Sequence, residues 1–186
     1  MNLVWVLNEL ATRTNILAQT MLQLDERRRN QVHLALEQAI IEEKHHHDLA
    51  EVMATIDELA VSERVKEHMR QVYQLLAQAE ASVHGCSVEE THFHEVGNAG
   101  SIRNVLGVCV AVEAFAPERI VATHVQTGEG TVICAHGELD IPAPATRALL
   151  QTGIPTCEYT FPGERCTPTS AALIAHFVDE FQERIF

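Results

Sequence analysis

The chain has 186 residues, of which 46% are hydrophobic, and 13 basic against 26 acidic side chains give it a formal net charge of −13. This length suits one folded unit with one sizeable core, so we expect a single domain over residues 1–186. The negative charge repels nucleic-acid phosphates and anionic lipid headgroups. We therefore expect neither nucleic acid nor a membrane as a partner.

The five cysteines indicate neither a disulfide framework nor a zinc ribbon, because their number is odd and no C-x-x-C spacing occurs. Unpaired thiols are typical of a reducing compartment. The segment MNLVWVLNELATR has no cationic start before its apolar residues, and the longest apolar run, 105–116, is interrupted by Glu113. We expect a cytoplasmic protein without an export signal or a membrane span.

Helical patterns dominate the first half of the chain. Residues 3–43 contain no Pro or Gly and predict a helical hairpin or one long helix. Asp48, followed three residues later by Glu51, indicates a capping box and the start of another helix. A further amphipathic helix is expected to begin at Ser62 and to end near Gly85.

The second half mixes helix and strand patterns. A nearly all-apolar helix is expected around Gly107, whose missing side chain suggests close approach by a neighbouring backbone. The β-branched runs ERIVATHV and TVICAH, separated by QTGEG, predict a hairpin at about residues 118–136. HGELDIPAPAT is expected to be irregular, with Pro144 in the first turn of a short helix that ends near Gly153.

The last segments predict one more strand and a terminal helix. CEYTF is typical of a strand, PGE of a turn, and Thr167 with Pro168 of the cap and first residue of an amphipathic helix. The expected fold class is α+β, with a helix-rich N-terminal half, a central buried helix and a small sheet in the C-terminal half.

The segment THFHEV contains a first candidate metal site. If the segment is extended, His92 and His94 lie on one side, since strand side chains alternate, and two imidazoles so placed can share one metal ion. Glu95 would then point the other way and could only support the ligands. Alternatively, both histidines cap loops or pack beneath the central helix, because a metal site needs more than two ligands.

The run EEKHHHD, with His45, His46 and His47, is a second candidate. Neutral imidazole is a good ligand for nickel, copper or zinc, and the neighbouring carboxylates would raise the local concentration of a cation. The run could equally be a polar surface loop.

A third candidate is CAHGELDIPAPAT, in which Cys134 and His136 share strand parity and so offer a thiolate and an imidazole on one side. A cysteine in a strand can also be a small buried hydrophobe. The glycine-rich pieces GNAG and QTGEG could expose backbone amides to an anion, but neither has the form of a nucleotide-binding motif.

Three segments together, THFHEVGNAGSIRNVLG, TGEGTVICAHGELDIPAPAT and GERCTPTSAAL, resemble the N-terminal part of the LarC-type nickel insertion proteins. The histidine run and the helices after it also resemble this family, so that residues 44–186 are family-like and residues 1–43 form a divergent helical lead-in. The resemblance implies nickel insertion into a pyridinium bis-thiocarboxylate mononucleotide, driven by cytidine triphosphate with a divalent metal. In that family this step matures the nickel-pincer cofactor of lactate racemase.

On this resemblance nickel is the expected metal, and its candidate ligands are His45, His46, His47, His92, His94 and His136. Glu95, Cys134 and Glu164 are candidates for supporting roles.

The chain also departs from the family pattern. Gly100 and Asn104 stand where the pattern E-V-G-x-x-D-S-I-x-D has carboxylates, and Ser170 replaces the glycine of T-P-T-G. The start MNLVWVLNELATR does not resemble the family's D-x-F-S-G-x-x-G-D-M, and the part associated with cytidine triphosphate would lie beyond Phe186.

We therefore expect a nickel-handling protein that works with a separate nucleotide-binding subunit or with the cofactor precursor, and association into a homo-oligomer would be one way to compensate for missing parts. The alternative is a non-catalytic binding or assembly module that kept the fold and lost the metal site.

Overall fold

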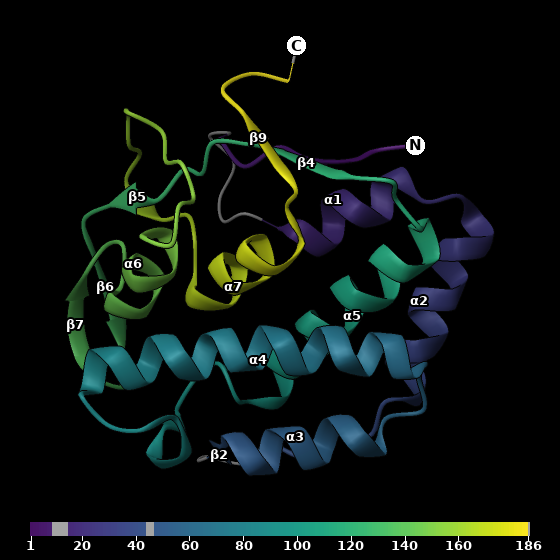
Figure 1. Cartoon of the computed structure of the whole chain (residues 1–186), viewed down its shortest axis with the longest axis horizontal. Coiled ribbons are helices and arrows are strands. Elements are labelled where there is room, and N and C mark those ends of the chain that lie inside the picture. Colours follow the sequence, from purple (N-terminus) through teal and green to yellow (C-terminus); the bar gives the residue numbers. More distant parts are fainter. Residues whose placement is uncertain (9–14, 44–46, 186) are drawn as a thin grey trace.

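The structure, a computed structural model, describes residues 1–8, 15–43 and 47–185, and this part of the chain contains seven helices and a small parallel sheet at the edge of the helical body (Figure 1). The helices are α1 (Ile16–Gln23), α2 (Glu26–Gln38), α3 (Leu49–Glu58), α4 (Glu63–His84), α5 (Ala99–Phe115), α6 (Pro144–Leu150) and α7 (Pro168–Phe177), with a short 3-10 helix η1 at Val88–Glu90. The strands are β1 (Leu3–Trp5), β2 (His47–Asp48), β3 (His92–Phe93), β4 (Ile120–Thr123), β5 (Gly128–Glu129), β6 (Thr131–Cys134), β7 (Gly137–Asp140), β8 (Gly163–Glu164) and β9 (Glu180–Gln182). The expected α+β class is confirmed. No described helix combines the length and the apolar character needed to cross a lipid bilayer.

The helix starts predicted from caps are confirmed. Asp48 and Glu51 form the reciprocal capping box of α3, and the Ser62 side chain accepts from the Val65 amide at the start of α4. Gly85 ends α4 in the left-handed conformation, with φ of 67°, which glycine adopts without steric cost.

The central helix is α5, which is buried on most of its surface. A Cβ on Gly107 would lie 2.9 Å from a methyl group of Leu17, so side chains rather than a neighbouring backbone approach this glycine closely. Arg103 ties α5 to α2, because its guanidinium donates to the carbonyls of Leu36 and Ala39 at the C-terminal end of α2. The prediction of a buried central helix is confirmed, and the predicted backbone contact is wrong.

The strand pairings differ from the predicted hairpin over residues 118–136. β4 pairs in parallel with β1 on one side and β9 on the other, and β6 pairs antiparallel with β7. All four β4 side chains are buried, as expected of the middle strand of a parallel sheet. The exposure of the β6 side chains alternates, as expected of a two-stranded ribbon with one solvent-exposed face. The hairpin therefore spans residues 131–140, and residues 137–140 form a strand instead of an irregular segment.

Four more local predictions are wrong, and the first shows how partners far along the chain decide the structure. Residues 3–5 form β1, because Leu3 and Trp5 are fully buried and pair with β4. Within 157–161, the predicted strand CEYTF, no described residue is in a strand, and the predicted turn PGE contributes β8. Helix α7 does begin at Pro168 with Thr167 as its cap, but most of its surface is buried, so it is not amphipathic.

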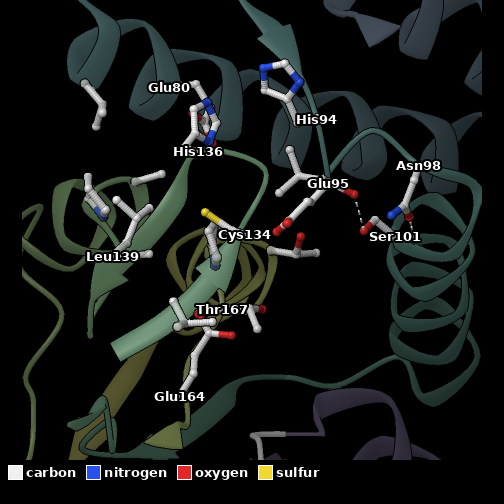
Figure 2. A pocket seen from close by; sticks show the side chains of 18 of the residues that line it. Glu80, His94, Glu95, Asn98, Ser101, Cys134, His136, Leu139, Glu164 and Thr167 are labelled. Carbon is white, nitrogen blue, oxygen red and sulfur yellow. Dashed lines mark hydrogen bonds between the residues drawn. The ribbon is translucent and has the colours of Figure 1, made fainter. Parts of the chain in front are cut away.

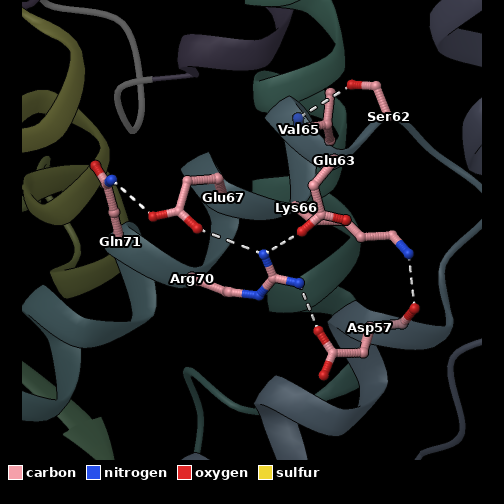
Figure 3. A network of polar contacts seen from close by, with 8 residues as sticks. All are labelled: Asp57, Ser62, Glu63, Val65, Lys66, Glu67, Arg70 and Gln71. Atoms are coloured by element: carbon pink, nitrogen blue, oxygen red, sulfur yellow. Dashed lines mark hydrogen bonds and ion pairs between the residues drawn. The ribbon is translucent and has the colours of Figure 1, made fainter.

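A polar network joins α3 to the first half of α4 (Figure 3). Arg70 donates to Asp57 of α3 at 2.6 Å and to Glu63 at 2.7 Å, while Lys66 donates to the Asp57 carbonyl. The carboxylates are largely exposed, so water and salt screen these pairs.

We expect Arg70→Gln to lower the melting temperature, and we expect the loss to shrink as sodium chloride is raised, because screening already weakens the ion pairs in the unchanged protein. Thermal melts at low and high salt measure this. Arg28→Gln, which removes an exposed pair with Asp25 on α2, is the control. Equal, salt-independent losses in both variants would contradict the role of the network.

A histidine pair joins α4 to α7 at the other side of the core. His68 Nδ1 and His176 Nε2 lie 2.8 Å apart, and both rings contact Phe177. Burial lowers the pKa of His176 to about 4, and burial together with Arg64 lowers the pKa of His68, against which Glu67 and Glu113 act.

The free energy of unfolding should therefore fall as the pH drops from about 6.5, the ordinary histidine value, towards 4, because the unfolded chain binds more protons than the folded one in this window. We expect His68→Gln combined with His176→Gln to flatten the curve there. Denaturant titrations at several pH values test this, with exposed His33→Gln as control. A double variant with the slope of the unchanged protein would overturn this assignment.

Candidate functional site

A cavity of about 740 Å³ opens among the described residues (Figure 2). Its walls come from the C-terminal end of α4, residues 94–104, the β6–β7 hairpin, and the segments that lead into α6 and α7. Parts of the three family-like segments, around His94, Cys134 and Thr167, thus converge on one place.

Residues 94–98 run along the cavity wall, and their backbone is fixed by contacts at several residues. The buried Tyr73 hydroxyl donates to the Val96 carbonyl at 2.8 Å. At Gly97 there is no space for a side chain, since a Cβ would lie 2.8 Å from the Phe93 Cβ and 3.0 Å from the His47 Cβ. Asn98 then caps α5 by accepting from the Ser101 amide at 2.8 Å. The contacts of Val96, Gly97 and Asn98 therefore fix the backbone that carries the side chains of His94 and Glu95.

Three imidazoles meet at this cavity, and we call His84, His94 and His136 the histidine cluster. The ring centroids of His94 and His136 are 4.8 Å apart, and those of His84 and His136 are 5.1 Å apart. The three rings come from α4, from the segment after β3 and from the hairpin turn, and Figure 2 shows His94 and His136 on the same side of the cavity.

A partly buried carboxylate, Glu80, adjoins the histidine cluster. It lies 3.4 Å from His84 Nε2, one helical turn away. Burial raises the pKa of Glu80, and the nearby His84 and His136 act in the opposite direction. The carboxylate and the imidazoles together can accept protons or offer nitrogen and oxygen ligands to a cation.

The three residues predicted from sequence to have supporting roles all line the cavity. The Glu95 carboxylate accepts from the Ala135 amide at 3.3 Å, which links residues 94–98 to the turn of the hairpin. Cys134 is half-buried, and Glu164 lies on the wall near the start of α7 (Figure 2). His136 occupies the hairpin turn rather than the strand, yet it lines the same cavity as Cys134.

The remaining predicted ligands are placed elsewhere or lie outside the described residues. His92 is exposed on β3 opposite Asp48 and does not line the cavity. The strand ends at Phe93, so the alternation that placed His92 beside His94 does not continue. His47 is 3% exposed and packs beside Gly97. His45 and His46 lie outside the described residues.

Sequence reasoning missed Glu80 and His84. Their spacing of four residues places them on one face of α4, but an E-x-x-x-H pair inside a long amphipathic helix carries no signal until the hairpin brings His136 beside it. In the described ranges, no three His, Cys, Asp or Glu side chains stand close enough, as placed, to hold a metal ion.

Imidazoles, a thiol and carboxylates, the groups that borderline metals prefer as ligands, therefore line one cavity. The chain belongs to the nickel insertion protein family, which matches it over residues 2–185. This match also covers residues 2–43, which were expected to form a divergent lead-in.

Curated relatives are similar over about three quarters of the chain. The chain is 39% identical over 140 residues to a pyridinium-3,5-bisthiocarboxylic acid mononucleotide nickel insertion protein of Staphylococcus epidermidis. It is 42% identical over 134 residues to the protein of that description from Staphylococcus saprophyticus, and 40% identical over 140 residues to a putative nickel insertion protein of Geotalea uraniireducens. These alignments cover 75%, 72% and 75% of this chain, but only 35%, 34% and 36% of the respective relatives. No solved structure matches the chain significantly.

We expect Tyr73→Phe to lower the free energy of unfolding by about 1–3 kcal/mol, because the buried Val96 carbonyl loses its hydrogen-bond donor. Denaturant titration measures the change. Tyr159→Phe, at a half-exposed position, is the control and should have a small effect. Similar losses in the two variants would show that the Tyr73 hydroxyl does not anchor residues 94–98.

Proposed function

We propose that the cavity holds a nickel ion and the pyridinium mononucleotide into which relatives of this chain, by their description, insert nickel. The observation that carries this proposal is the meeting of His84, His94 and His136 at one cavity, next to a thiol and three carboxylates. Nickel is here cargo to be passed on rather than a permanent part of the protein.

The histidine cluster suits transient binding of such an ion. Neutral imidazole is a good ligand for nickel, and the half-exposed Cys134 adds a softer donor on the same cavity. Ring centroids about 5 Å apart allow side-chain rotations to direct two nitrogens at one ion. Two or three protein ligands leave coordination positions open, as transfer to another molecule requires.

The cavity also fits the organic partner. Its volume of about 740 Å³ lies in the usual range of small-molecule sites, roughly 300–1,000 Å³. Glu80, Glu95 and Glu164 line it, and their negative charges complement the positive charge of a pyridinium ring. A carboxylate whose pKa is raised by burial, as in Glu80, is suited to accept a proton from a bound ligand.

The complete reaction is proposed to need more than residues 1–186. The chain spans about a third of the length of the curated relatives it matches. We propose that cytidine-nucleotide binding, which the family resemblance implies, is supplied by a region or subunit outside these residues. Gly100 and Asn104 line the cavity where the family pattern has carboxylates, so the site relies more on its histidines.

We expect metal-free protein to bind Ni²⁺ saturably, and we expect His94→Ala combined with His136→Ala to weaken this binding by at least about tenfold, since the pair supplies two of the nearest nitrogens. Isothermal titration calorimetry with nickel chloride measures it. A double variant of two histidines distant from the cavity, His33→Ala with His124→Ala, is the matched control.

Unchanged nickel affinity in the His94 and His136 double variant, with the fold intact by circular dichroism, would reject the proposed metal role. That result would favour the alternative, a binding or assembly module that keeps the fold without the metal chemistry.

A further inference from the structure

We propose that the first turn of α7, centred on Thr169, is the subsite for the phosphate group of the mononucleotide. This inference rests on the proposed function, because it assigns one end of the same cavity to one part of the same ligand. The histidine cluster and the start of α7 lie on different sides of the cavity, as Figure 2 shows for His136 and Thr167.

The local sequence leaves donors available at this helix start. Thr167 caps α7 by accepting from the Ser170 amide at 3.2 Å, and Pro168 has no amide hydrogen to donate. The Thr169 amide is therefore the first that is available to a ligand. A helix of ten residues adds the positive end of its dipole at this point.

The Thr169 side chain supplies the second and independent observation. It lines the cavity and is only 7% exposed, and its hydroxyl makes no hydrogen bond to any residue that the structure describes. The hydroxyl oxygen is not fully enclosed, since among the described residues only the Thr146 hydroxyl is both enclosed and unpaired, so the Thr169 hydroxyl is accessible to a ligand in the cavity that it lines. An oxygen of a bound ligand would pair with both the hydroxyl and the amide of Thr169.

The residues that line the cavity indicate which chemical group of the ligand supplies the oxygen that pairs with Thr169. Neither lysine nor arginine is among the described residues that line the cavity, and the histidine cluster lies away from α7, so an anion at the start of α7 would be held by amide and hydroxyl donors. Donors arranged around a helix start are typical of phosphate sites. Glu164 stands on the same wall and opposes an anion, so removing its charge should tighten binding.

The experiment compares two ligands that differ only by the phosphate. Nicotinic acid mononucleotide and nicotinic acid riboside both carry a pyridinium ring with a carboxylate, and calorimetry on the full chain measures the affinity of each. We expect Thr169→Val to weaken the mononucleotide about tenfold and to leave the riboside unchanged, because a hydrogen bond to a charged group is lost. Thr169→Ser should restore binding, and Glu164→Gln should tighten the mononucleotide alone.

The control is Thr152→Val, an exposed threonine away from the cavity, which should change neither affinity. If Thr169→Val weakens both ligands equally, or if the two ligands bind the unchanged protein equally well, the phosphate lies elsewhere and the proposed function still stands. If neither ligand binds, the subsite and the precursor-binding part of the proposed function both fail.

Discussion

The hydrogen bond from the Tyr73 hydroxyl to the Val96 carbonyl holds the part of the chain on which the cavity depends. Tyr73 belongs to α4, and Val96 lies between the cavity residue Glu95 and the cap of α5. Directly beside it, Gly97 lets the backbone pass against Phe93 and His47 at distances that no side chain permits. One buried hydroxyl and one missing Cβ thus set where His94 and Glu95 stand relative to the two longest helices.

The features that sequence predicted well depend on near neighbours in the chain. The caps at Asp48, Ser62 and Thr167 each bond within three residues, so their patterns are visible in a short window. The features that it missed depend on distant partners. The paired residues Leu3 of β1 and Ile120 of β4 are 117 positions apart in the sequence, and short strands of three or four residues carry little signal of their own.

The candidate site shows the same division. His94, Cys134 and His136 were singled out because histidines and a cysteine in glycine-flanked segments are unusual, and all three line the cavity. Period-two alternation placed His92 beside them, but β3 is only two residues long. Glu80 and His84 escaped notice, because their partner His136 lies 52 residues after His84 and reaches it only through the hairpin.

The contact between the Glu95 carboxylate and the Ala135 amide has a consequence for metal binding. This contact fastens the hairpin turn to residues 94–98 along the edge where His94 and His136 face each other. Under the proposed function, an ion bound by both imidazole rings would form a second contact across the same edge. Binding of the ion would then be coupled to the position of the hairpin turn, and this edge of the cavity would be more rigid with the ion bound than without it.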